Sequence, residues 1–91
     1  MLSIVWTEEA RRDLLGIVAY IAERNPSVVV QLGRAIEQST WPLSQNPYLF
    51  KRGERMEGCR EIVVHRNYVL VYRVGEAIDV LRVVHARQQY P

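Results

Sequence analysis

Residues 58–91 read GCREIVVHRNYVLVYRVGEAIDVLRVVHARQQYP and contain three runs rich in Val, Ile, Leu and Tyr. Two short polar links, Arg66-Asn67 and Gly75-Glu76, separate the runs and have the length that closes antiparallel hairpins. The pattern therefore predicts a three-stranded meander, with strands at Arg60–His65, Tyr68–Val74 and Ala77–His85.

Two-residue turns at both links would fix how these strands pair. The predicted partners are His65 with Tyr68, Val63 with Leu70, Val74 with Ala77, and Leu70 with Leu81. On this register neither face of the sheet is polar, whereas an antiparallel sheet with one side in water has a polar face. We therefore expect something to cover both faces, and a bulge or a slip of one residue would exchange them.

An opening strand and a helix are expected before the meander. Leu2, Ile4 and Trp6 occupy alternate positions, which indicates a short strand that adds to the edge of the sheet. Thr7 followed by two glutamates is typical of a helix start, since the hydroxyl caps unpaired amides and the acids lie at the positive end of the dipole. The helix is expected over Thr7–Arg24. Its inward stripe is predicted to hold Ala10, Leu14, Ile17, Val18 and Ile21.

A second helix is predicted after Asn25-Pro26, because Asn ends or caps helices and Pro is favoured in a first turn. Pro42 should end this helix near Trp41. The fold class is therefore α+β in a single domain, residues 1–91. An N-terminal helical hairpin packs on a small antiparallel sheet, and a short N-terminal strand is added to the C-terminal three-stranded meander.

Composition indicates an ordinary globular chain. No apolar run approaches the roughly 20 residues that a membrane helix needs, and the start lacks the pattern of an export signal, so we expect a cytoplasmic location and no membrane partner. Cys59 is the single cysteine, which excludes an internal disulfide. The net charge of +2 divides into −1 for residues 1–50 and +3 for residues 51–91, which permits an anionic partner without demanding one.

His65 and His85 end on the same side of the predicted sheet, with Tyr68 near His65 and with Arg87 and Tyr90 beyond His85. Histidine exchanges protons near neutral pH, and arginine holds phosphate or stabilises developing charge. Such a group would cut RNA by activating a ribose hydroxyl without a metal ion. A histidine at a strand end is also a common half-exposed surface residue, so both interpretations stand.

Metal and cofactor chemistry is not indicated. The two histidines and the scattered acids show no ligand spacing, and neither a glycine-rich phosphate loop nor a nucleophile elbow is present. We therefore expect no metal site and no cofactor. Glu61 and Asp79 are expected to pair with Arg73 or Arg82 near the sheet ends.

Segments along nearly the whole chain resemble the RelE/ParE superfamily of bacterial toxins from type II toxin-antitoxin pairs. They are TEEARRDLLGIVAYIAERNP (7–26), PLSQNPYL (42–49), GCREIVV (58–64), NYVLVYRV (67–74) and IDVLRVVHARQQYP (78–91). The most specific parts are Gly58 with Arg60-Glu61, the strand from Tyr68, and the ending from His85. The resemblance implies a toxin with a RelE/ParE-like fold.

Two activities exist in that superfamily. RelE-like members resemble small ribonucleases that cut messenger RNA in the ribosomal A site, whereas ParE-like members poison DNA gyrase. RelE-like chains typically carry an arginine at the place that Val64 occupies here, and the sequence ends at Pro91 without a helix to deliver a catalytic tyrosine. These features favour the ParE-like branch, which implies a gyrase inhibitor that is not an enzyme. A third hypothesis is an inert relative that keeps only antitoxin binding.

Site residues follow from each branch. Target-binding candidates, chosen from chemistry and position, are Arg60, Arg73, His85 and Arg87. On the ribonuclease alternative, with the ribosome and messenger RNA as partners, Arg87 and one of His85, His65 or Tyr90 would carry the acid-base chemistry.

The resemblance also implies a cognate antitoxin that wraps the toxin and holds it inactive. An apolar sheet with one helical hairpin independently predicts a surface for a partner. The candidates for antitoxin binding are Leu14, Ile17, Val69, Val71 and Val80.

Overall fold

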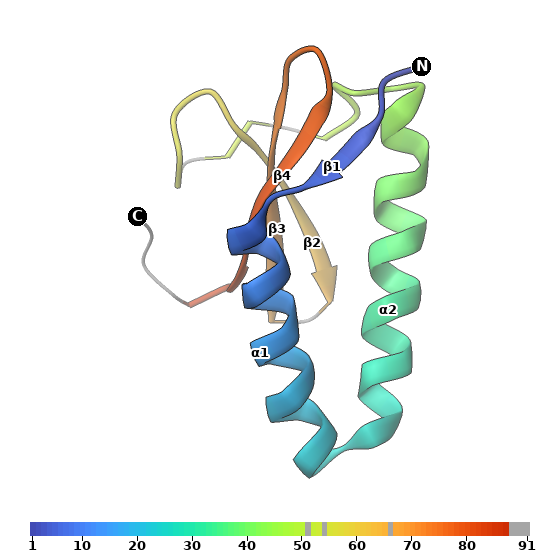
Figure 1. The fold of residues 1–91 in the computed structure, drawn as a ribbon, viewed down its shortest axis with the longest axis vertical. Coiled ribbons are helices and arrows are strands. Elements are labelled where there is room, and N and C mark those ends of the chain that lie inside the picture. Colours follow the sequence, from blue (N-terminus) through green and yellow to red (C-terminus); the bar gives the residue numbers. More distant parts are fainter. Residues whose placement is uncertain (51, 54, 66, 88–91) are drawn as a thin grey trace.

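The computed structural model describes residues 1–50, 52–53, 55–65 and 67–87. Its elements are β1 Ile4–Trp6, α1 Glu8–Arg24, α2 Pro26–Thr40, the 3-10 turn η1 Trp41–Ser44, β2 Arg60–His65, β3 Tyr68–Val74 and β4 Ile78–His85 (Figure 1). The two helices pack on one four-stranded sheet, which confirms the predicted α+β class. Within the described part of the chain, no helix has both the length and the apolar character needed to span a membrane.

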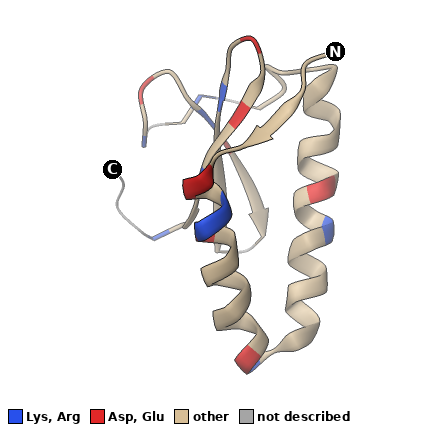
Figure 2. Cartoon of the chain, in the orientation of Figure 1, with Lys and Arg blue, Asp and Glu red and all other residues tan. Residues whose placement is uncertain are grey.

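Thr7 starts α1 and also ties it to the sheet. Its side-chain oxygen accepts a hydrogen bond from the Ala10 amide at 3.2 Å, and its hydroxyl donates to the Val80 carbonyl at 2.9 Å. Acidic side chains occupy the first turn, which is the red segment at the start of α1 in Figure 2, and they favour the positive end of the helix dipole. The predicted helix start is confirmed, and the same residue joins α1 to β4.

The turn between the helices consists of Asn25, whose amide donates to the Ile21 carbonyl at 2.7 Å. Pro26 is the first residue of α2, and Pro42 lies in η1 directly after α2 ends. The two helices lie side by side as an antiparallel hairpin (Figure 1). Both predicted proline roles are therefore confirmed.

The strand order is β1-β4-β3-β2, with β1 parallel to β4 and the two hairpins antiparallel. The sheet is thus mixed, not wholly antiparallel. His65 pairs with Tyr68 as predicted, but Val63 pairs with Val69 and not with Leu70. A bulge between Val63 and His65 inserts one extra residue, so every pair before it shifts by one.

The predicted register of β3 with β4 was wrong. Val74 pairs with Ile78 and not with Ala77, because the link has three residues and the Gly75 amide donates to the Ala77 carbonyl at 2.9 Å. A further irregularity between Val71 and Tyr72 changes the offset again. It places Leu70 opposite Val83 and not opposite Leu81.

A helix-side core fills the space between the hairpin and the sheet, with α1 against β4 and α2 against β2. Its buried members are Ala10, Ile21, Leu32, Ile36, Leu43, Ile62, Val64, Leu70, Tyr72, Ile78, Val80 and Val83. Tyr72 is completely buried, and its hydroxyl donates to the Pro47 carbonyl at 3.2 Å. This bond spares the core an unpaired polar group, which would be costly.

A second, smaller core lies on the other face of the sheet. Cys59, Val69, Val71 and Val84 are buried there, with Met56, Leu81 and Ala86 packed against them. The segment before β2 and the residue after β4 thus supply cover that sequence reasoning assigned to a partner. This face needs no second protein to bury these four side chains.

Candidate functional site

Strand pairing brings two histidines and a tyrosine together at one end of the sheet. Tyr68 is the partner of His65 in β2 and of His85 in β4, so it lies between them. The Tyr68 and His85 rings meet edge to face, with centroids 5.5 Å apart and planes at 80°. We call His65, Tyr68, His85 and the adjacent Arg87 the strand-end cluster. The prediction that Tyr68 lies near His65 is confirmed, whereas the pairing of Tyr68 with His85 follows from a β3–β4 register that differs from the predicted one.

His85 is oriented by the backbone that follows it. The Arg87 amide donates to His85 Nδ1 at 3.2 Å, and the Ala86 amide donates to the Asn67 carbonyl at 2.6 Å. An imidazole whose Nδ1 accepts a hydrogen bond carries its proton on Nε2. The Arg87 side chain is exposed, so its guanidinium is available to an anionic partner.

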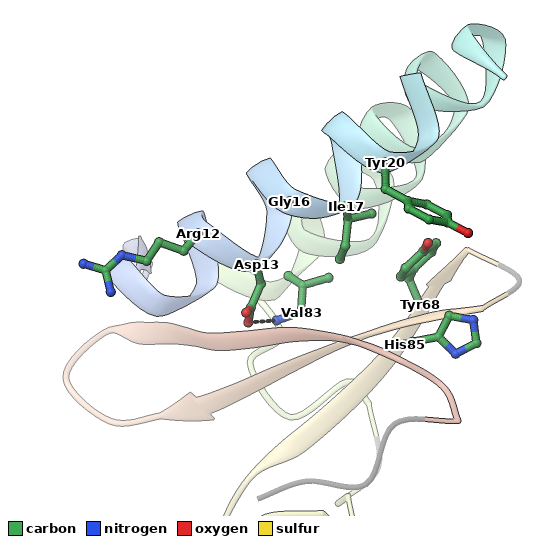
Figure 3. A pocket seen from close by; sticks show the side chains of 8 residues that line it. All are labelled: Arg12, Asp13, Gly16, Ile17, Tyr20, Tyr68, Val83 and His85. Atoms are coloured by element: carbon green, nitrogen blue, oxygen red, sulfur yellow. Dashed lines mark hydrogen bonds between the residues drawn. The ribbon is translucent and has the colours of Figure 1, made fainter. Parts of the chain in front are cut away.

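The strand-end cluster borders a cavity of about 420 Å³ between α1 and the sheet. Its lining residues are Arg12, Asp13, Gly16, Ile17, Tyr20, Tyr68, Val83 and His85. Figure 3 shows Tyr20 reaching from α1 toward the side where Tyr68 and His85 lie. Helix and sheet therefore both contribute to this surface, although sequence reasoning drew the cluster from the strands alone.

Asp13 is the acidic residue of the cavity, and three donors surround its carboxylate. Arg82 Nε and Nη2 donate at 2.6 and 3.0 Å, and the Val83 amide donates at 3.0 Å. A carboxylate held in this way is a structural anchor between α1 and β4. Sequence reasoning missed it, but the signal was present: Asp13 lies beside Leu14 on the inward stripe of an amphipathic helix.

Two other target-binding candidates lie away from the strand-end cluster. Arg60 begins β2 and pairs with Tyr72, and Arg73 pairs with Asp79 near the far end of β3. At about 3.3 Å per residue, the five steps from Tyr68 to Arg73 span roughly 16 Å. The structure therefore brings His85 and Arg87 together but separates them from Arg60 and Arg73.

Arg60 and Arg73 both have local partners. The Arg60 guanidinium donates to the Phe50 carbonyl at 2.5 Å and lies 4.9 Å from the centre of the Tyr48 ring. Arg73 is 3.9 Å from the Asp79 carboxylate, as the sequence predicted.

The other predicted ion pairs were wrong. Glu61 pairs with Arg55 at 2.7 Å, and Arg82 pairs with Asp13 at 2.6 Å. Both actual partners lie outside the strands from which the predicted pairs were drawn.

The antitoxin-binding candidates divide into two groups. Leu14 and Ile17 keep part of their surface exposed on α1. Val69, Val71 and Val80 are at most 3% exposed, so the folded chain offers almost no surface there. Tyr90, predicted for the ribonuclease alternative, lies outside the described residues. Across the described ranges, no three His, Cys, Asp or Glu side chains gather where they could hold a metal ion.

Sequence and fold similarity both connect the chain to bacterial toxins. The profile of a family described as "ParE toxin of type II toxin-antitoxin system, parDE" matches residues 4–90. A protein of Sinorhizobium fredii named "Putative toxin Y4kP" is 34% identical over 94 residues, which cover 97% of this chain and 92% of that protein.

Two solved structures share the fold along almost their full length. One, described as a chromosomal ParDE TA system from P. aeruginosa, is 26% identical with a TM-score of 0.79, over 96% of this chain and 98% of that one. The RelBE2 toxin-antitoxin complex of Mycobacterium tuberculosis is 25% identical with a TM-score of 0.59, over 92% and 96% of the two chains.

Proposed function

The chain belongs to the ParE toxin family of type II toxin-antitoxin systems, and we propose that it inhibits DNA gyrase and that a cognate antitoxin holds it inactive. The observation that carries the proposal is the ParE family match over residues 4–90. The higher TM-score to the ParDE structure than to the RelBE2 structure, 0.79 against 0.59, supports the same branch.

The residue at position 64 also favours gyrase over messenger RNA. RelE-like chains typically place an arginine there, whereas this chain has Val64, which is 5% exposed and belongs to the helix-side core. An arginine at a buried core position would carry an unpaired charge into an apolar site. The packing is therefore fitted to an apolar residue where the ribonuclease branch needs a cation.

The strand-end cluster supports binding better than proton transfer. His85 accepts a hydrogen bond at Nδ1, and the nearby Asp13 carboxylate is fully engaged by Arg82 and Val83. Arg87, exposed beside His85, offers a planar set of donors to an anionic or carbonyl-rich surface. We assign Arg87 and His85 to target binding.

Purified gyrase tests this proposal directly. The wild-type chain should reduce supercoiling and increase the fraction of cleaved DNA, and Arg87→Ala should weaken both effects at least about tenfold, as the loss of one charged contact does. Arg11→Ala is the matched control, because it removes one exposed arginine from α1. Unchanged supercoiling and cleavage with folded wild-type protein would rule out gyrase as the target.

The ribonuclease alternative rests on one observation, the grouping of His65, Tyr68 and His85 at the sheet end. If it holds, the chain cuts messenger RNA on ribosomes, and Arg87→Ala or His85→Ala abolishes the cuts. Primer extension on ribosome-bound messages distinguishes this activity from gyrase inhibition, since a gyrase inhibitor leaves those messages intact.

Antitoxin binding is proposed at Leu14 and Ile17. Both side chains are partly exposed on α1, and Ile17 lines the cavity beside the strand-end cluster. A partner covering Ile17 would also lie against Tyr68 and His85. It would thereby inhibit the toxin by blocking the strand-end cluster from its target. Ile17→Glu should then weaken complex formation with the antitoxin while leaving toxicity intact.

A further inference from the structure

Arg55 joins three separate segments of the chain. Its backbone amide and its Nη1 donate to the two carboxylate oxygens of Glu61 in β2, at 3.2 and 2.7 Å. Its Nη2 donates to the Ala86 carbonyl directly after β4, at 2.7 Å. We call Arg55, Glu61 and the Ala86 carbonyl the Arg55 clasp.

The clasp is partly shielded from water, which weakens the competition of water for its hydrogen bonds. The Arg55 and Glu61 side chains are 24% and 16% exposed. Each bond to a charged group in such a setting is stronger than its equivalent at the surface. The two guanidinium nitrogens also diverge at a fixed angle, which lets one side chain contact Glu61 and Ala86 together. A lysine ammonium has no such fork.

Gly53 makes room for the clasp. Its amide donates to the Cys59 carbonyl at 2.9 Å, which places its α-carbon directly against Glu61. A Cβ added at Gly53 would overlap the Glu61 carboxylate and the carbon atoms next to it. Since that carboxylate is held by Arg55, the overlap is relieved by moving Glu61 out of the clasp.

The clasp holds the backbone at Ala86, one residue before Arg87. The Ala86 amide is held by the Asn67 carbonyl at 2.6 Å, and the Ala86 carbonyl is held by Arg55. Both backbone polar groups of Ala86 are thus hydrogen-bonded. The amide bonds to the β2–β3 link, and the carbonyl bonds to the segment before β2. The backbone that carries Arg87 has little freedom to turn.

We propose that Arg55 is a positioning residue: its clasp fixes the direction in which Arg87 faces the target, with Glu61 and Gly53 as its supports. This inference rests on the proposed role of Arg87 in target binding. It assigns Arg55 no contact with the target, so its effect passes through Ala86.

Three variants separate positioning from charge and from stability. Arg55→Lys keeps the charge but loses the fork, and Gly53→Ala alters no charged group yet displaces Glu61. Arg52→Ala is the control, because it removes an exposed arginine from the same segment. Amide hydrogen exchange at Arg87, growth arrest on expression without antitoxin, and the midpoint of urea unfolding are measured for each.

Arg55→Lys and Gly53→Ala should speed exchange of the Arg87 amide by about tenfold, the effect of losing one charge-assisted hydrogen bond, while the amides of Val69 and Leu70 change less. Both variants should need about tenfold more protein for the same growth arrest. Arg52→Ala should match the wild type in both measurements.

Two results would overturn the inference. Unchanged Arg87 exchange in Arg55→Lys would mean that the clasp does not hold this backbone. Faster exchange with growth arrest at the wild-type dose would mean that the direction of Arg87 does not matter. Growth arrest does not depend on which target is hit, so a toxic chain that leaves gyrase unaffected would contradict the proposed target and leave the Arg55 inference standing.

Discussion

Among the residues of α1, Asp13 is the one whose substitution should most weaken the attachment of this helix to the sheet. Asp13→Asn removes the charge that binds Arg82 and leaves that guanidinium partly buried with a weaker acceptor. The free energy of unfolding should fall by about 1 to 3 kcal/mol, the range for hydrogen bonds to charged groups. Urea unfolding measures it.

Arg12→Gln serves as the control for Asp13. It breaks the exposed Arg12–Glu8 pair on the same helix and should cost less than about 0.5 kcal/mol. Equal losses for the two variants would mean that the Asp13–Arg82 contact is no more than a surface pair.

The raised pKa values of two buried groups predict how the free energy of unfolding changes at alkaline pH. Burial raises the pKa of the Cys59 thiol above its usual value of 9.0, an effect that Arg73 opposes and Glu61 reinforces. Burial likewise raises the pKa of the Tyr72 hydroxyl above 10.0, with the Arg60 guanidinium acting in the opposite direction. Each group stays protonated in the folded chain at a pH where the unfolded chain has lost the proton.

The free energy of unfolding should therefore be unaffected by Cys59 below pH 9.0 and should fall as the pH rises from there through the folded pKa. Urea unfolding of the wild type and of Cys59→Ala at steps above pH 9.0 measures the difference. The free energy of unfolding of Cys59→Ala should begin to fall at a higher pH than that of the wild type. Parallel curves would assign the decline to other groups.

At the scale of elements, β3 is the strand on which both cores depend. Leu70 belongs to the helix-side core and Val71 to the second core, and both are 0% exposed. Leu70→Asp or Val71→Asp should each cost more than about 4 kcal/mol and leave the chain unfolded, because each buries an unpaired charge. Circular dichroism and urea titration record the result.

Val63 gives the matched control for a charge placed in a strand. It lies in β2 and is 70% exposed, so Val63→Asp should cost at most about 1 kcal/mol, mainly through lost strand propensity. A folded Val71→Asp chain would show that the second core is a surface for a partner and not part of the chain's own interior.

Element bounds could be predicted closely, but their pairing could not. Period-two alternation and turn residues locate β2 and β3 because they depend on neighbours in the sequence. Register depends on single inserted residues: the bulge at Val64 and the three-residue link after Val74 each shift the ladder by one. Turn composition alone did not distinguish a two-residue link from a three-residue one.

At the scale of the whole molecule, the sequence indicated two apolar sheet faces, and the structure covers both from within the chain. Predicting the second cover needed the path of residues 55–59, which is set by Arg55 and Glu61 and not by periodicity. The His65–Tyr68 part of the strand-end cluster was predictable because the two residues flank a short link, whereas the Tyr68–His85 pairing depends on the β3–β4 register and was not. The Asp13–Arg82 and Arg55–Ala86 contacts join residues far apart in the sequence, so local patterns did not predict these pairings, although the inward position of Asp13 on α1 was predictable.

The central proposal is that this member of the ParE toxin family stops growth by inhibiting DNA gyrase. The most direct test is to induce the chain without its antitoxin in bacteria and to follow DNA synthesis and translation separately over the first minutes. We expect DNA synthesis to stop first, with filamentation and a DNA-damage response, and messenger RNA to stay intact. An early stop in translation with cut messages would contradict it and make the strand-end cluster a catalytic site.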